Sequence, residues 1–169
     1  MLFSFNRVLG ATALLAFAAF AFALFSQHVL GMAPCAWCIL QRMICLAIGL
    51  VAGIGWLLRS NGAAAGFAMG VSFLLAMGGA VAAWYQHTVA AKSFSCDLTF
   101  ADRFVAGSGL DQALPQLFGI YATCAESAVS LLGVQYEIWT LILFLLIAMG
   151  NVLALARPRS SGPGPAEPR

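Results

Sequence analysis

The sequence predicts an all-α integral membrane protein, a four-helix bundle with a long outward-facing loop that carries a short interfacial helix. Hydrophobic residues make up 62% of the 169 residues and charged residues only 8%, and the mean hydropathy is +0.94. Soluble domains carry about 25% charged residues, so a lipid bilayer rather than water must solvate this surface. The net charge of +2 includes no basic cluster, and we expect no nucleic-acid partner.

Four apolar segments are long enough to cross a bilayer as helices, which takes roughly 20 residues each. They cover residues 8–27, 38–58, 63–85 and 138–156. Each must be helical, because lipid offers no hydrogen-bond partner to a free backbone N–H or C=O group. Residues 1–156 should therefore form a single four-span membrane domain. Small-residue spacing that lets helices approach closely recurs at Gly49, Gly53, Gly62, Gly66 and Gly70,.

The connections between the spans differ in length. Loops 28–37 and 86–137 lie on one side of the membrane, and the second is long enough to carry function,. The tail 157–169 is rich in Pro, Gly, Ser and Arg, and it is expected to be disordered,. Within the long loop, four apolar residues share one helical face: Leu110, Leu114, Leu117 and Phe118,. They predict a short interfacial helix, which Pro115 keeps from being long and regular.

The basic residues orient the chain across the membrane. With the N-terminus inside, the cytoplasmic segments hold Arg7, Arg59, Arg157, Arg159 and Arg169. The outer segments hold only Lys92 and Arg103, apart from Arg42 at the border. The positive-inside rule therefore predicts cytoplasmic termini and an outward-facing long loop. Residues 1–23 could instead be a cleaved signal peptide, but their apolar run is longer than the roughly 7–15 residues usual there.

Four cysteines fall in the outward-facing segments and form two pairs by position. Cys35 and Cys38 form a C-x-x-C motif at the mouth of the second span, where the first turn of a helix favours a thiolate,. Cys96 and Cys124 both lie in the long loop, where an oxidising environment would pair them,. Two neighbouring disulfides can exchange. The alternatives are structural staples, or a zinc site in which two of Cys96, Cys124, His28 and His87 complete the C-x-x-C pair,.

Arg42 is the costliest residue of the spans, because a cation inside a membrane helix is rare and usually functional,. It lies one turn below Cys38 on the same helix face, where it could stabilise a thiolate or a bound acceptor. The alternative is that it snorkels to the headgroups. His87, at the outer end of the third span, could donate a hydrogen bond to an acceptor between the helices. Cys45 lies deeper and is read as a small hydrophobe.

Four segments resemble, in order and spacing, the bacterial disulfide bond formation protein B (DsbB) family. They are Cys35-Ala-Trp-Cys38-Ile-Leu-Gln-Arg42, Tyr85-Gln86-His87-Thr88, Ser95-Cys96-Asp97 and Thr123-Cys124-Ala125-Glu126. The resemblance runs from the first span to the fourth. The sequence departs from the pattern at Gln41, since an acidic residue precedes the arginine in some members.

The resemblance implies a bacterial inner-membrane enzyme, a quinone-dependent thiol oxidase that reoxidises a periplasmic DsbA-like dithiol carrier. It implies that the carrier attacks Cys96 and frees Cys124. Cys124 would then attack Cys35, which releases Cys38 as a thiolate facing the quinone.

The resemblance also assigns the acceptor site. Arg42 would stabilise the thiolate and the quinone, and His87 would lie near a quinone oxygen. Ubiquinone is expected rather than menaquinone, and no metal is implied. Two alternatives stay open: a non-enzymatic membrane scaffold or metal-binding protein with structural cysteines, and a vitamin K epoxide reductase-like enzyme. The order of the cysteine motifs fits the second alternative poorly.

Overall fold

The structure, a computed structural model, describes residues 2–92, 99–127 and 129–156. Four long helices form its body: α1 (Leu2–His28), α2 (Ala36–Leu57), α3 (Gly62–Thr88) and α7 (Tyr136–Ala156). All four are long and apolar enough to cross a membrane. The prediction of an all-α, multi-pass membrane bundle is confirmed. Cys96 and the tail 157–169 lie outside the described residues.

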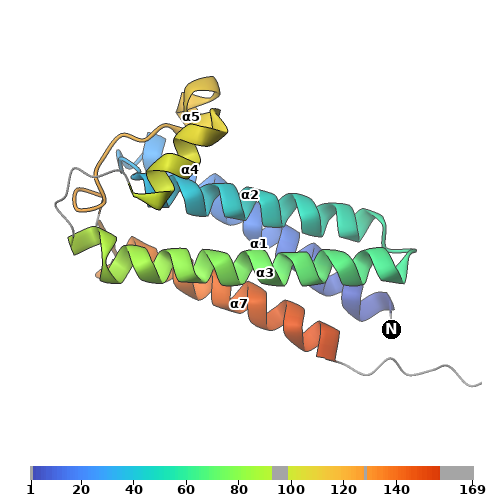
Figure 1. The fold of residues 1–169 in the computed structure, drawn as a ribbon. Coiled ribbons are helices and arrows are strands. Elements are labelled where there is room, and N and C mark those ends of the chain that lie inside the picture. The colour runs from blue at the N-terminus through green and yellow to red at the C-terminus, as the bar shows by residue number, and fades with distance from the viewer. Residues whose placement is uncertain (1, 93–98, 128, 157–169) are drawn as a thin grey trace, which may run out of the picture.

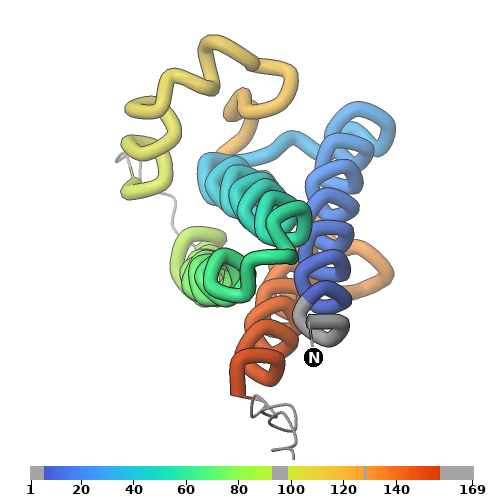
Figure 2. The backbone as a smooth tube through the Cα atoms, turned by 90° about the vertical axis from the view of Figure 1, so that its right-hand side faces the viewer, coloured from blue at the N-terminus to red at the C-terminus, as the bar shows by residue number. Residues whose placement is uncertain are grey.

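The helices run up and down, so that α1 begins and α7 ends at the same end of the bundle (Figure 1). Helix α2 packs against both α1 and α3, and the most extensive contact joins α3 to α7. The end-on view shows the four helices grouped around a shared interior, with the yellow segment that contains residues 100–113 off to one side (Figure 2). Three apolar clusters fill this interior in sequence along the bundle axis. The cluster at the loop end contains Cys35.

Most glycines of the predicted small-residue pattern do not lie where two helices meet. Other glycines allow the close helix packing. A Cβ added at Gly53, Gly66 or Gly70 would meet no atom within 4 Å. At Gly55, by contrast, the added atom would collide with the Cβ of Ala68 on α3, and at Gly79 it would lie 2.6 Å from the Phe144 ring. Small-residue spacing alone does not reveal which face of a helix meets a neighbour.

We expect Gly55→Ala to destabilise the bundle by about 1–3 kcal/mol, because an overfilled contact forces two helix backbones apart. Ala68 offers no flexible side-chain end that could move aside. Gly66→Ala is the matched control, since it adds the same methyl group to α3 in open space. Thermal unfolding in detergent measures both. Equal melting temperatures for the two variants would contradict the assigned α2–α3 contact.

The long outer loop folds over one end of the bundle. Its elements are η1 (Ala90–Lys92), α4 (Phe100–Ser108), α5 (Leu110–Ala113), α6 (Pro115–Phe118), β1 (Ser130–Leu131) and β2 (Val134–Gln135). Helix α4, which the sequence analysis did not predict, begins with a capping box between Thr99 and Asp102. The predicted interfacial helix is broken at Leu114, whose φ of −133° is not helical, because Pro115 starts a new turn,.

The two short helices after α4 are anchored on the bundle by the first residue of α5 and the last two residues of α6. Phe118 is buried in the cluster around Cys35, and Leu110 and Leu117 pack against that cluster. Leu114, in contrast, is 47% exposed. The strands β1 and β2 form an antiparallel hairpin whose two turn residues, Leu132 and Gly133, both have positive φ,. This hairpin leads directly into α7.

Candidate functional site

The C-x-x-C motif lies at the start of α2, beneath the folded outer loop. Cys35 is the N-cap residue and is fully buried, and Cys38 falls in the first helical turn. The two sulfur atoms are 3.1 Å apart, with both residues as free thiols. The unpaired N–H groups and the dipole of the helix start favour negative charge on sulfur at this place.

Backbone hydrogen bonds hold the second loop cysteine against this motif. Tyr121 N and Ala122 N donate to the carbonyl oxygen of Pro34, at 3.0 and 3.3 Å. The following turn is closed by Glu126, whose carboxylate accepts from the backbone N–H and the hydroxyl of Thr123. These hydrogen bonds lower the pKa of the Glu126 carboxyl. The turn places Cys124 against the cluster that contains Cys35.

Cys35 interacts with both of the other described thiols of the site. It donates a hydrogen bond to Cys124, which lowers the pKa of the Cys124 thiol from its ordinary value of 9.0. The same interaction, more than burial, raises the pKa of Cys35 to about 11, although its contact with Cys38 acts in the opposite direction. Cys124 is therefore the better nucleophile of the pair at neutral pH.

In the fully reduced protein, Cys35→Ala should slow alkylation of Cys124 at pH 7 by about threefold, because the hydrogen bond that favours its thiolate is lost. The difference should vanish at high pH, where the thiol ionises without help. Cys35→Ser is the matched control, since a hydroxyl of similar size can still donate. Mass spectrometry of the Cys124 peptide measures the rates. Equal slowing in both variants would contradict the assigned hydrogen bond.

Arg42 is held inside the bundle, with only 5% of its surface exposed. Its Nη1 donates to Gln27 Oε1 at 2.7 Å and to the Leu117 carbonyl oxygen at 2.6 Å. Its Nη2 donates to the Ala23 carbonyl oxygen at 3.1 Å. Arg42 thus joins α1, α2 and the end of α6, and its guanidinium has a fixed position.

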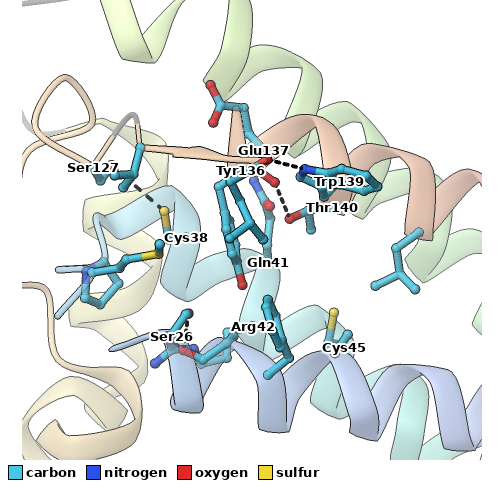
Figure 3. Close-up of a pocket in the computed structure, with 18 of the residues that line it drawn as sticks. Ser26, Cys38, Gln41, Arg42, Cys45, Ser127, Tyr136, Glu137, Trp139 and Thr140 are labelled. Atoms are coloured by element: carbon cyan, nitrogen blue, oxygen red, sulfur yellow. Dashed lines mark hydrogen bonds between the residues drawn. The ribbon is translucent and has the colours of Figure 1, made fainter. Parts of the chain in front are cut away.

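A cavity of about 340 Å³ lies next to Cys38 and Arg42, between α1, α2 and α7, with the β-hairpin along one side. Most of its wall is apolar, and its polar groups include Gln41 and Tyr136. Figure 3 shows Tyr136 reaching from α7 toward Arg42. This size and mixture are typical of sites for small organic ligands.

The residues of this cavity fit a quinone ring. Arg42 Nε is buried and has no hydrogen-bond partner among the described residues, so it remains available to a ligand oxygen. Phe20, Phe22 and Leu143 provide apolar surface for a flat ring and its tail. Cys38 and Arg42 line the same cavity, so the Cys38 sulfur would lie beside a ligand held there.

The structure places the other predicted residues at different distances from this cavity. Gln86 rather than His87 lines it; the Nδ1 atom of His87 lies 3.4 Å from Glu137 Oε1, and Glu137 is itself part of the wall. His28 faces the Gln116 carbonyl oxygen at 3.1 Å. Cys45 lines the inner part of the cavity. No three His, Cys, Asp or Glu side chains gather as a metal site in the described ranges.

Sequence reasoning missed four polar residues of the site: Gln27, Gln86, Ser127 and Tyr136. Two of them could have been found by the argument applied to Arg42, since a polar residue at the end of an apolar span is itself a functional hypothesis. Gln27 and Gln86 both stand at such ends. Ser127 and Tyr136 lie outside the predicted spans, and no sequence signal singled them out.

The chain is similar to one family of known proteins over most of its length. Residues 6–154 match the family "Disulfide bond formation protein DsbB". The chain is 31% identical over 158 residues to a "Disulfide bond formation protein B" of a Polaromonas species, with 90% of this chain and 91% of the relative covered. It is 34% identical over 146 residues to a protein of the same name from Neisseria meningitidis, covering 83% and 89% of the two chains.

Proposed function

Because the chain belongs to the DsbB family of disulfide bond formation proteins, we propose that it is a thiol oxidase of the bacterial inner membrane. It reoxidises a periplasmic, DsbA-like dithiol carrier and passes two electrons to a membrane quinone. Both termini are cytoplasmic, and the redox cysteines face the periplasm. The observation that carries the proposal is the position of Cys35, which interacts with Cys124 on one side and with Cys38 on the other.

The reaction begins with two disulfides, Cys96–Cys124 and Cys35–Cys38. A carrier thiolate attacks Cys96, forms a mixed disulfide and releases Cys124 as a thiolate. Cys124 attacks Cys35, so a Cys35–Cys124 bond forms and Cys38 leaves as a thiolate. The lowered pKa of Cys124 and its contact with Cys35 support this order.

The second half of the cycle restores the enzyme. The second thiol of the carrier loses its proton and attacks the carrier sulfur that is bonded to Cys96. This forms the disulfide of the oxidised carrier and releases Cys96 as a thiolate. Cys96 attacks Cys124, which re-forms the loop disulfide and frees Cys35. The Cys35–Cys38 disulfide closes again when two electrons leave through Cys38 into the cavity.

A quinone held in this cavity by Arg42 and the apolar wall would be the oxidant, accepting two electrons and two protons per disulfide made. Such an acceptor is needed because DsbA-type carriers have reduction potentials of about −120 mV, which are higher than those of common thiol–disulfide couples. A common disulfide would therefore not reoxidise the carrier. Arg42 orients the acceptor through its free Nε–H and stabilises negative charge beside Cys38. His87 holds Glu137 at the edge of the cavity, and ubiquinone is the expected acceptor.

Quinone reduction by the purified protein in detergent, followed optically after reduced DsbA-type carrier is added, tests this function. We expect reduction that requires the carrier, and an oxidised carrier in equal amount to the quinol formed. If a correctly folded sample reduces none of several ubiquinones and menaquinones, the proposed function is wrong.

A further inference from the structure

Two buried glutamine side chains connect α2 and α3 beside the C-x-x-C motif. Gln41 Nε2 donates a hydrogen bond of 2.7 Å to Gln86 Oε1. Gln86 Nε2 in turn donates to Cys38 Sγ at 3.3 Å. Only 4% of Gln41 and 3% of Gln86 is exposed, and both side chains line the cavity. The two amides thus form a hydrogen-bonded chain that ends on the sulfur of Cys38.

The direction of this chain matters for the charge on sulfur. A thiol can donate or accept a hydrogen bond, whereas a thiolate can only accept one. Gln86 must therefore present its NH₂ group to Cys38 when the sulfur is ionised, because its carbonyl oxygen would repel the charge. Gln41 fixes that orientation by occupying the Gln86 oxygen. In a buried site such a hydrogen bond is stronger than in water, and linked amides polarise one another.

The other titratable groups around Cys38 act on it by charge, as Arg42 does, or as thiols, and the described side-chain N–H donor to its sulfur is Gln86. On α2, Cys35 is a thiol 3.1 Å away, and the described hydrogen bonds of Arg42 go to oxygen atoms of α1 and α6. Cys124 in the loop and Tyr136 on α7 interact with Cys38 by charge only. On α3, His87 faces Glu137.

We propose that Gln86 is a further catalytic residue, which stabilises the Cys38 thiolate by direct donation, and that Gln41 is a positioning residue, which holds the Gln86 amide in the donating orientation. The inference rests on the proposed function, since it gives the released Cys38 thiolate its stabilising partner. It also explains how the site works without an acidic residue before Arg42. A carboxylate at either glutamine position would oppose the thiolate.

Alkylation of the fully reduced, full-length protein tests the role of Gln86 without carrier or quinone. Iodoacetamide is added at pH 7, and mass spectrometry gives the rate at Cys38 relative to Cys124 in the same sample. We expect Gln86→Met to lower this ratio about tenfold, because a hydrogen bond to a charged atom is lost. Gln86→Glu should lower it further. This variant is nearly isosteric and still accepts from Gln41, so it serves if the methionine variant does not fold.

The role of Gln41 is tested by the same ratio. Gln41→Met should lower it about threefold, because the Gln86 amide is then free to turn over. Gln41→Glu should lower it more, since a carboxylate accepts from the Gln86 NH₂ group and turns the carbonyl toward sulfur. In the Gln86→Met background, Gln41→Met should have no additional effect, because the amide that it orients is gone. If Gln41 had only a structural role, Gln41→Met would lower the Cys38 to Cys124 ratio further in the Gln86→Met background.

Two results would overturn the proposal: an unchanged Cys38 to Cys124 ratio in both Gln86 variants, or full additivity of the two methionine substitutions. A ratio that falls as expected supports the amide chain whether or not quinone is reduced. Failure of the proposed oxidase function is recognised separately. In that case the glutamine variants change the alkylation ratio as expected, but the wild-type protein does not reduce quinone with the carrier.

Discussion

Replacing Cys38 with serine should lower carrier-dependent quinone reduction to below about one-thousandth of the wild-type rate, because serine is not ionised at neutral pH and cannot form a disulfide. Cys38 lines the cavity, and in the proposed relay the electrons leave through its sulfur. The measurement is the initial rate of quinone reduction with saturating reduced carrier, on protein shown to be folded by circular dichroism.

The same Cys38→Ser variant should separate the two halves of the relay. Cys124 and Cys35 can still pair, so a Cys35–Cys124 disulfide should form on oxidation and be found by peptide mapping. Cys45→Ala is the control: it removes a thiol from the same helix and should keep most of the activity, because the relay does not use it. Full activity of Cys38→Ser would overturn the assigned electron exit.

Arg42→Met should raise the KM for quinone by about tenfold or more, while the KM for the thiol carrier changes little. A charge-assisted hydrogen bond is worth about 1.5–3 kcal/mol, and the unpaired Nε of Arg42 is the donor positioned for a ligand oxygen,. In the proposed relay the carrier reacts first at Cys96, which is a separate step. The two KM values, measured with each substrate varied in turn, test this difference.

Arg42→Lys is the matched control for charge. It retains a cation but lacks the forked geometry with which Arg42 holds Gln27 and the Leu117 and Ala23 carbonyl oxygens together,. We expect an intermediate quinone KM and a lower melting temperature for lysine than for the wild type. If Arg42→Met leaves the quinone KM unchanged, Arg42 has a structural role only.

In the outer loop, the prediction from sequence was incomplete. An apolar face from Leu110 to Phe118 predicted one short helix, whereas the chain forms two turns that break before Pro115. Local periodicity identified the apolar residues but not the surface that receives them. That surface is the cluster around Cys35, and it exists only after α2 and the loop have met.

The site could also be predicted only in part, because local sequence relates residues within one helix but not residues on different helices. Cys35, Cys38 and Arg42 lie within one stretch of α2, so helix geometry alone relates them. Gln86 reaches Cys38 from 48 positions along the chain, and only the packing of α3 on α2 brings its amide to the sulfur. His87, the neighbouring residue, carries the more familiar chemistry but points to Glu137 on α7.

By itself, the sequence determined the membrane environment and the number of spanning helices, because the cost of placing polar groups in lipid leaves few choices to so apolar a chain. It also predicted thiol redox chemistry, because a C-x-x-C motif with a cation one turn away on the same helix favours that use of the sulfur atoms. Only the tertiary structure decided which sulfur meets which, and which amide faces Cys38. Those contacts join segments that are distant in the sequence, and they depend on side-chain packing that local sequence patterns do not encode.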